Sequence, residues 1–386
     1  MTERLDMTLV LAWGALLLVG LVMVTSAAAG QPEGTYYYLF RHGLYVAVAV
    51  CVFGLLAVVP LRAWEIVHKP CLVLAFALCL LVFLPGLAAA AKGAHRWIDL
   101  GLARFQPAEA AKLLAIIYLA GYLARVGGQV SVSLSALLKP VIWVGGLLAV
   151  ILVQPDFGST VVLALVMGGM LFLAGARPRD FALLVVFGGM LLAGAAVIEP
   201  YRVVRLLSFV DPWADQLDAG YQLTQALIGF GRGEYFGIGL GEGVQKLFYL
   251  PEAHNDFIYA VIAEELGLVG ALGVLALLGF LTVRMFGIGR RVVAAGQVFA
   301  GSLAYGAGLL IGIQTIINVG VNTGVLPTKG LTLPFVSFGG NSLLVCSAAV
   351  ALALRVDYEY ERGGDSSGAG FPPSDLASSR TQGGYA

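Results

Sequence analysis

Long apolar stretches dominate the pattern of hydrophobic and polar positions along this chain. A helix needs about 20 consecutive apolar residues to cross the hydrocarbon core of a bilayer. Polar segments separate ten such stretches, at residues 8–28, 42–60, 70–91, 107–126, 138–154, 157–175, 181–198, 257–285, 300–325 and 333–355. The pattern predicts an all-α polytopic membrane protein with ten transmembrane helices, of which the first is retained and not cleaved as a signal peptide.

One long interval, residues 199–256, separates the seventh stretch from the eighth. Four apolar residues in this interval fall roughly on one helical face: Leu217, Tyr221, Leu227 and Ile228. They indicate a helix that lies on the membrane surface. Residues 363–386 are rich in Gly, Ser and Pro, which is typical of disorder. We therefore expect a single transmembrane domain over residues 1–362 and a disordered cytoplasmic tail.

Basic residues are distributed unequally between the two sides of the predicted bundle. If the N-terminus is inside, the short inner segments carry twelve of them: Arg4, Arg62, Lys69, Arg125, Lys139, Arg177, Arg179, Arg284, Arg290, Arg291, Arg355 and Arg362. The short outer loops carry five: Arg41, Lys92, Arg96, Arg104 and Lys329. Because cytoplasmic loops carry the excess of Lys and Arg, both termini are predicted to be cytoplasmic and the loop of residues 199–256 extracytoplasmic.

Composition agrees with this class and excludes others. Hydrophobic residues make up 59% of the chain and charged residues 12%, whereas soluble domains average about 25% charged. The formal net charge is zero, so nothing favours nucleic-acid binding. The four cysteines lie in apolar runs without a Cys-x-x-Cys motif and the four histidines are scattered, so spacing indicates no metal cluster.

The loop-to-helix junction before the eighth stretch carries His254, Asn255 and Asp256 in succession. Ionisable groups at membrane depth are costly unless they are paired or hydrated, so they usually mark function. Asp256 has two interpretations: its oxygens cap the helix N-terminus, or it is a general base that takes a proton from a hydroxyl nucleophile. Capping alone would weaken such a base, because hydrogen bonds to a carboxylate stabilise the anion.

Four more ionisable residues lie inside predicted spans. Glu109 and Lys112 are three residues apart and share a helix face, either as an internal ion pair or as the polar lining of a wet cavity that positions a substrate. Glu264 and Glu265 lie about two turns into the eighth stretch. Adjacent helical residues point about 100° apart, so at most one of these glutamates is expected to line a cavity.

The predicted outer face holds two further candidate features. The segment from Gln154 to Gly158 is either a tight turn or a loop that presents Asp156 as a metal ligand. Basic residues on this face either snorkel singly or hold an anionic ligand such as a lipid pyrophosphate. They are Arg96, Arg104, Arg202, Arg205, Arg232, Lys246 and Lys329.

Glycine is concentrated in residues 229–243, in a pattern that matches neither Gly-x-Gly-x-x-Gly nor a Walker motif. We expect a flexible outer loop that packs close to backbone or substrate. The Pro and Gly residues of 327–342 are expected to interrupt the start of the last span, which membranes tolerate only around protein or water.

Five separated motifs, in this order, resemble those of the SEDS family, the polytopic proteins of cell shape, division and sporulation that include FtsW, RodA and SpoVE. The resemblance runs from about Leu5 to Glu361. Its motifs are Arg96-Trp97-Ile98, Gln106 to Lys112, Gln154 to Gly158, Leu250 to Ile258 and Pro327 to Pro334. Residues 250–254, 326–334 and 355–359 are more similar to the division branch, FtsW, than to the elongation branch, RodA.

The resemblance implies a peptidoglycan glycosyltransferase that polymerises lipid II on the outer face of the cytoplasmic membrane during septal wall synthesis. It also implies a class B penicillin-binding protein as partner, together with other divisome membrane proteins. The family's essential aspartate falls on Asp256. The chain has Asn255, Phe338 and Asn341 where threonine, tyrosine and serine are common in the family, and none of these differences removes an ionisable group.

From these residues we expect inverting transfer with Asp256 as general base, aided by outer cations and by a divalent cation, Mg²⁺ or Mn²⁺. The candidate substrate-binding residues are Glu109, Lys112, Arg96, Arg202, Arg205, Lys246, His254, Lys329 and Ser337, and Asp156 is the candidate metal ligand. The alternatives are a lipid II flippase, a RodA-like role in elongation, and a scaffold that only recruits a penicillin-binding partner. Most of the polar groups cluster outside, which favours the enzyme over a flippase.

Overall fold

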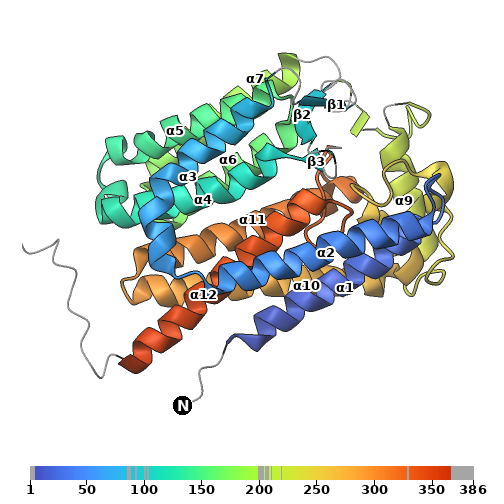
Figure 1. The fold of residues 1–386 in the computed structure, drawn as a ribbon. Coiled ribbons are helices and arrows are strands. Elements are labelled where there is room, and N and C mark those ends of the chain that lie inside the picture. Colours follow the sequence, from blue (N-terminus) through green and yellow to red (C-terminus); the bar gives the residue numbers. More distant parts are fainter. Residues whose placement is uncertain are drawn as a thin grey trace, which may run out of the picture.

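Long helices that run roughly parallel or antiparallel to one another form most of the molecule (Figure 1). The computed structural model describes residues 5–84, 88–91, 94–99, 101, 104–198, 204, 208–209, 211–218, 220–327 and 330–366. Its helices are α1 (Met7–Ala27), α2 (Thr35–Val58), α3 (Leu61–Leu81), α4 (Pro107–Val126), α5 (Leu134–Val153), α6 (Phe157–Leu173), α7 (Pro178–Ile198), α9 (Tyr221–Gly233), α10 (Ile258–Ala294), α11 (Val298–Asn322) and α12 (Gly340–Ser366). A small antiparallel sheet has the order β1 (Ala88–Ala91), β2 (Ala94–Asp99), β3 (Arg104–Phe105).

The helices match the predicted apolar stretches closely. Within the described residues, nine helices are long and apolar enough to cross a membrane, and α6 is a shorter apolar helix. Several boundaries differ from the prediction. α2 already begins at Thr35, α10 continues to Ala294 instead of ending at 285, and α12 covers Gly340–Ser366 instead of 333–355. The stretch predicted at 70–91 belongs to a helix that covers Leu61–Leu81 and is followed by the strand at Ala88–Ala91. The alanine strand pairs with β2, and hydropathy alone cannot distinguish such an apolar strand from a helix.

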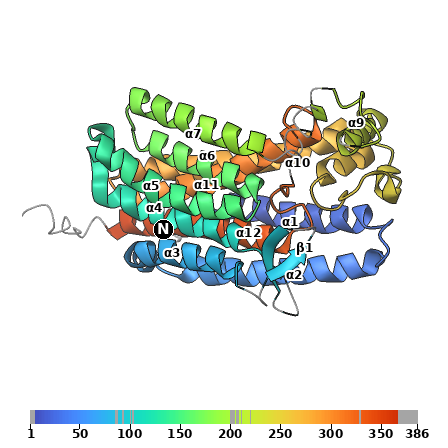
Figure 2. The same cartoon turned by 90° about the horizontal axis from the view of Figure 1, so that it is seen from above.

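The helices differ in how much of their surface other helices cover. The buried share of the most apolar window is 72% for α12 and 61% for α11, but 0% for α7. α11 and α12 therefore lie in the interior, and α7 lies at the edge beside α6, as both views show (Figures 1 and 2). The face of α7 away from α6 is left for lipid, which explains why α7 is apolar all round.

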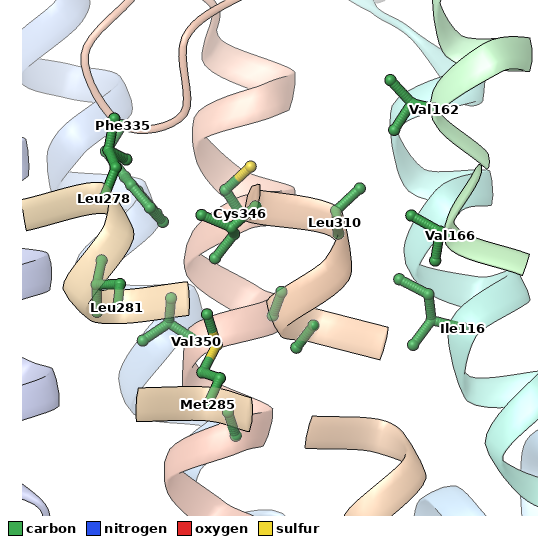
Figure 3. Close-up of a cluster of buried hydrophobic side chains, with 14 of the residues drawn as sticks. Ile116, Val162, Val166, Leu278, Leu281, Met285, Leu310, Phe335, Cys346 and Val350 are labelled. Carbon is green, nitrogen blue, oxygen red and sulfur yellow. The ribbon is translucent and has the colours of Figure 1, made fainter. Parts of the chain in front are cut away.

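The buried core joins α4, α6, α10, α11 and α12 at the centre of the molecule (Figure 3). Its fully buried side chains include Ile116, Val166, Leu278, Leu281, Met285, Leu310, Cys346 and Val350. Because lipid is as apolar as leucine, association of these helices depends on close packing. The contact between α10 and α11 is glycine-mediated: a Cβ built on Gly301 would come 2.8 Å from the carbonyl oxygen of Gly289.

Helix α10 is interrupted at Gly267, which has φ 69° and ψ −171°. The interruption frees backbone groups that have no water to bond to at membrane depth. The segment that follows α9 supplies partners for them. The Ile238 and Gly239 N–H groups donate to the carbonyls of Glu264 and Glu265, both at 3.1 Å.

The first N–H groups of the second half of α10 also find hydrogen-bond partners near this segment, at the end of α9. The Leu268 N–H donates to the Glu234 carbonyl at 2.9 Å, and the Val269 N–H donates to the Tyr235 carbonyl at 3.1 Å. This close approach explains why glycine is concentrated here: a Cβ on Gly237 would collide with the Glu265 carbonyl. The expectation that the glycine run packs close to backbone is confirmed.

Replacement of Gly267 tests the interruption. Its φ and ψ fall in a region that is essentially restricted to glycine, and an added Cβ would collide with the Gly237 backbone nitrogen. We expect Gly267→Ala to lower the free energy of unfolding by about 1–3 kcal/mol from backbone strain alone. The thermal midpoint in detergent measures this loss. Gly273→Ala, in the same helix with open space around it, is the control and is expected to be neutral or slightly stabilising; equal losses in both variants would contradict the interpretation.

Candidate functional site

The backbone of Asp256 is held by two asparagines of α11. The Nδ2 groups of Asn318 and Asn322 both donate to the Asp256 carbonyl at 3.0 Å. The two asparagine side chains are 1% and 0% exposed. Asp256 itself is half-buried, so its backbone is fixed while its side chain lies at the boundary between protein and surroundings.

The N-terminus of α10 does not use Asp256 as its cap. The N-cap residue is Phe257, whose side chain makes no capping bond. The Ala260 N–H, in the first turn of the helix, donates to Asn322 Oδ1 at 3.2 Å as well as to the Phe257 carbonyl at 3.1 Å. Of the two interpretations of Asp256, the structure therefore assigns capping to a residue of another helix.

Residues 330–338, which precede α12, bind the other side of this loop. The Phe338 N–H donates to the His254 carbonyl at 2.9 Å, and the Ser337 hydroxyl donates to the Asn255 carbonyl at 2.7 Å. Ser337 also accepts the Leu333 N–H at 2.7 Å, and its side chain is buried. The structure thus shows Ser337, a predicted substrate-binding residue, as a support of the Asp256 loop.

Gly330 lies directly beside the Asp256 carboxylate. A Cβ built at this glycine would be 2.9 Å from Asp256 Oδ2. Asn318 fixes this segment as well, because its Nδ2 also donates to the Leu331 carbonyl at 2.6 Å. The carboxylate therefore faces a segment that lacks a side chain at the point of closest approach.

His254 is packed among aromatic rings next to this loop. Its ring centroid lies 4.9 Å from that of Tyr38 and 5.6 Å from that of Phe338. Burial lowers the pKa of His254 below its ordinary value of 6.5, and the nearby carboxylates of Glu252 and Glu33 oppose this shift only in part. His254 Nδ1 is buried and has no hydrogen-bond partner in the described structure. The imidazole is therefore held in its neutral form.

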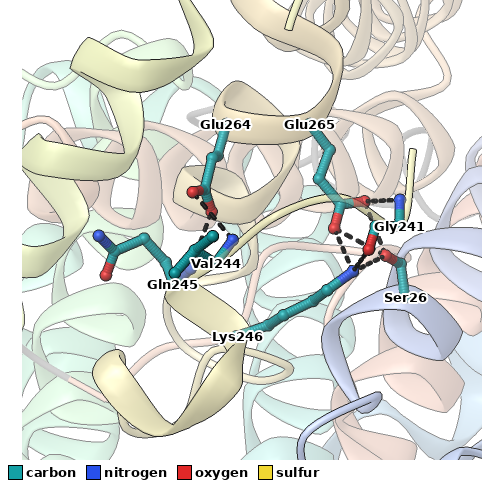
Figure 4. A network of polar contacts seen from close by, with 7 residues as sticks. All are labelled: Ser26, Gly241, Val244, Gln245, Lys246, Glu264 and Glu265. Atoms are coloured by element: carbon teal, nitrogen blue, oxygen red, sulfur yellow. Dashed lines mark hydrogen bonds and ion pairs between the residues drawn. The ribbon is translucent and has the colours of Figure 1, made fainter. Parts of the chain in front are cut away.

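Glu265 is the centre of a buried ion-pair network next to the α10 interruption (Figure 4). Lys246 Nζ lies 2.7 Å from Glu265 Oε1, 2.9 Å from the Ser26 hydroxyl and 2.6 Å from the Gly241 carbonyl. Ser26 and the Gly241 N–H also donate to the same carboxylate. The Lys246 side chain is 2% exposed and its three donors are all used. This corrects the expectation that Lys246 binds an anionic substrate.

Glu264 binds the same loop a few residues further along, at Val244 and Gln245 (Figure 4). Its carboxylate accepts the Val244 and Gln245 N–H groups, both at 3.1 Å, and lies 3.7 Å from Arg232 Nε. We expected at most one of Glu264 and Glu265 to line a cavity. The structure buries both, at 0% and 1% exposure, and uses both to hold residues 241–246 against α10.

Glu109 and Lys112 form the expected ion pair, with Nζ 2.8 Å from Oε1. Both are buried at the start of α4. Glu109 Oε2 and Gln314 Nε2 are buried atoms without a hydrogen-bond partner, and Gln314 Oε1 accepts the Cys346 thiol at 3.3 Å. Polar atoms without protein partners inside a membrane protein are typical of hydrated or ligand-binding interiors, which keeps the cavity interpretation open beside the ion pair.

Asp156 is a helix cap. Its Oδ1 accepts the Ser159 N–H at 3.0 Å, and its Oδ2 accepts the Ser159 hydroxyl and Gln106 Nε2, both at 2.8 Å. In the described parts of the chain no group of three or more His, Cys, Asp or Glu side chains could hold a metal ion. The turn interpretation is confirmed, and the donor set does not fit a metal site at Asp156.

Other predicted outer cations have different positions. Arg96 fixes the same turn, since it donates to the Gln154 carbonyl at 3.2 Å and to the Pro155 carbonyl at 2.6 Å. Arg104 is exposed on β3. Arg202, Arg205 and Lys329 lie outside the described residues.

The sequence-based prediction missed Asn318 and Asn322, whose side chains hold the Asp256 backbone. A signal was present, because the two amides are four residues apart on one face of an otherwise apolar span. Amides inside a membrane need hydrogen-bond partners as acids do. The free-energy cost of burying an amide is smaller than that of burying a charge, so a buried amide is a weaker sign of function.

The chain is similar in sequence to a known protein family. The family model described as "Cell cycle protein", for FtsW, RodA and SpoVE, matches residues 6–362. The chain is 50% identical over 368 residues to a probable peptidoglycan glycosyltransferase FtsW of Nitrosococcus halophilus, with 93% of each chain covered. It is 44% identical over 383 residues to a protein of the same name in Pseudomonas fluorescens, covering 98% of this chain and 94% of the other.

Solved structures have the same fold. A chain from a peptidoglycan synthase complex, whose structure concerns the coordination of polymerization and crosslinking, aligns with a TM-score of 0.77 at 29% identity. The alignment covers 92% of this chain and 98% of that one. The rod shape determining protein RodA of Thermus thermophilus aligns with a TM-score of 0.68 at 26% identity, over 92% and 97% of the two chains.

Loss of the Lys246 ammonium should expose the cost of a lone buried carboxylate. We expect Lys246→Met to lower the free energy of unfolding by about 3–5 kcal/mol, because the buried Glu265 carboxylate would lose its cationic partner. Arg232→Met is the matched control: Arg232 is 42% exposed and 3.7 Å from Glu264, so its loss should cost less than about 1 kcal/mol. Denaturant midpoints in detergent give both values. The double variant Lys246→Met/Glu265→Gln should recover much of the loss, and a double variant as unstable as the single one would contradict this account.

The buried neutral imidazole of His254 should make the loop sensitive to acid. As pH falls below about 6.5, the unfolded chain takes up a proton on His254 before the folded chain does, so stability present at higher pH is lost. We expect the thermal midpoint of the wild type to fall more steeply between about pH 7.5 and pH 5 than that of His254→Phe, which keeps the ring packing and cannot titrate. The difference between the two profiles isolates His254 from the other titrating groups; parallel profiles would rule out its contribution.

Proposed function

Because the chain belongs to the FtsW, RodA and SpoVE family of cell cycle proteins, we propose that it is a peptidoglycan glycosyltransferase that polymerises lipid II, with Asp256 as general base. The observation that carries this proposal is the way in which neighbouring residues hold Asp256. Two buried asparagines fix its backbone, and the adjacent helix is capped by another residue. Relatives 44–50% identical to this chain along nearly its whole length are named as probable enzymes of this activity.

The protein is a multi-pass membrane protein, and we propose that its two termini lie in the cytoplasm. The start of α1 and the end of α12 lie toward the same end of the bundle in both views (Figures 1 and 2). The excess of Lys and Arg in short segments at that end supports a cytoplasmic assignment. Asp256 then faces the outside. Residues 1–362 form the transmembrane domain of this proposal and the remainder a cytoplasmic tail.

In the proposed reaction Asp256 takes the proton of the acceptor sugar 4-hydroxyl. The hydroxyl oxygen forms a bond to the anomeric carbon of the donor, and the bond from that carbon to the lipid pyrophosphate breaks. Configuration inverts, because the attack comes from the face opposite the leaving group. The proton ends on Asp256 and the electron pair on the pyrophosphate, which departs as an anion.

Basic residues of the outer face would neutralise the departing pyrophosphate. Arg104 is the exposed described candidate, and Arg202, Arg205 and Lys329 belong to the same predicted set. Preorganised positive charge of this kind is often the largest contribution to rate. Glu109 and Lys112 would organise the interior below. A divalent cation, Mg²⁺ or Mn²⁺, stays a prediction. The Asp156 carboxylate, which was the candidate ligand, caps its own helix instead.

A class B penicillin-binding protein is the proposed partner, with other divisome membrane proteins around it. The solved chain with a TM-score of 0.77 comes from a complex that couples polymerization to crosslinking, which supports such a partner. The names of the relatives favour the division role over a RodA-like role in elongation.

A polymerisation assay tests the proposal. Purified protein and its partner would receive labelled lipid II, with penicillin present to stop crosslinking. We expect glycan chains with the wild type, and a loss of at least about a hundredfold with Asp256→Ala, because a general base contributes that much or more.

Asp211→Asn is the matched control, an outer-loop aspartate whose carboxylate accepts the Trp213 and Ala214 N–H groups away from the Asp256 loop. It should polymerise like the wild type. Equal product from wild type and Asp256→Ala would remove Asp256 from the catalytic role. Absence of polymer from the wild type, together with transfer of lipid II across vesicle membranes, would favour the flippase.

A further inference from the structure

Two other aspartates in the chain show what a carboxylate does at the start of a membrane helix. Asp6 is the N-cap of α1, and its Oδ1 accepts the Leu9 N–H at 3.3 Å. Asp156 is the N-cap of α6, and its Oδ1 accepts the Ser159 N–H at 3.0 Å. In both places the carboxylate serves its own helix, because a helix start presents unpaired N–H donors that favour an anion.

The start of α10 departs from this arrangement, although Asp256 is only two residues from the first helical residue, Ile258. Asn322 Oδ1, from α11, accepts the Ala260 N–H. An amide from a different helix therefore performs the bond that Asp6 and Asp156 make for themselves.

The same amide also fixes the backbone of Asp256. Asn322 Nδ2 donates to the Asp256 carbonyl at 3.0 Å and to the Asn318 carbonyl at 2.9 Å. Asn318 Nδ2 donates to the Asp256 carbonyl at 3.0 Å and to the Leu331 carbonyl at 2.6 Å. The two side chains thus join the loop of Asp256, the start of α10 and the segment that faces the Asp256 carboxylate.

We propose that Asn322 and Asn318 are positioning residues that hold Asp256 in its working geometry and keep its carboxylate from being drawn into the helix cap. The proposal rests on the proposed function of Asp256 as the base. An amide carries two N–H donors and an acceptor oxygen on separate atoms of one short neutral side chain, so Asn322 can donate to the Asp256 carbonyl and accept the Ala260 N–H at the same time without adding a charge next to Asp256. A carboxylate that caps a helix is stabilised as the anion, which opposes proton transfer to it. A displacement of about 1 Å in a catalytic group can reduce the rate about a hundredfold.

Variants at Asn322 test the proposal in the lipid II polymerisation assay with the full-length protein and its partner. Asn322→Ala removes the acceptor and the donor, and we expect kcat to fall about tenfold to a hundredfold while KM changes less than about twofold. Asn322→Asp keeps the shape of the side chain and an oxygen for the Ala260 N–H, but it cannot donate to Asp256. Because the carboxyl group enters a fully buried site, the fold of this variant is compared with that of the wild type by gel filtration and thermal midpoint. The kcat of the folded fraction should still fall, which keeps the test valid if the alanine variant is unstable.

Thr323→Ala is the matched control on the same helix. The Thr323 hydroxyl donates to the Val319 carbonyl within α11 and does not touch the Asp256 loop, so its removal should leave kcat unchanged. Hydrogen exchange of the peptide that covers residues 252–262 should accelerate in Asn322→Ala and not in Thr323→Ala.

The outcomes separate this proposal from the proposed function. A wild-type kcat in Asn322→Asp, or a rise in KM without a loss of kcat in either Asn322 variant, would overturn the positioning role even if Asp256→Ala is inactive. Full activity of Asp256→Ala would instead overturn the assignment of the base, whatever the Asn322 variants do.

Discussion

The constraint on which the structure depends is that a backbone group inside a membrane needs a hydrogen-bond partner. Helix α10 is interrupted at Gly267, and the end of α9 with the segment that follows it supplies partners for the backbone groups that the interruption leaves unpaired. Two adjacent glutamates then bind residues 241–246 and hold them against the helix. The loop that continues to Asp256 therefore starts from a fixed point.

Buried polar groups in this protein fall into two kinds. Lys246, Glu265 and Asp156 have protein partners for their polar atoms, and these residues hold the fold together. Glu109, Gln314 and His254 each retain a buried atom without a partner in the described structure. An unpaired polar atom in a low dielectric is costly, so its persistence calls for an explanation such as water, ligand or function.

Much of the architecture follows from the sequence, because membrane helices are set by local hydrophobicity. The spans, the ion pair of Glu109 and Lys112 and the close packing of the glycine run could all be predicted from neighbouring residues. The strand at Ala88–Ala91 could not, since its pairing with β2 is a tertiary fact. Lys246 was misjudged for the same reason: its partners Ser26 and Glu265 are 220 and 19 residues away, and no local pattern distinguishes a buried lysine from an exposed one.

The hydrogen bond between Ser26 and Glu265 has a consequence for how the protein is made. The two residues are 239 positions apart, so α1 enters the membrane long before its partner exists. At about 5–20 residues per second, synthesis of the intervening chain takes about 12 to 48 s. During this time the C-terminal end of α1 has no charged group to bind. The attachment that orders the Asp256 loop can thus close only after most of the bundle has been inserted, which makes the site one of the last parts of the molecule to assemble.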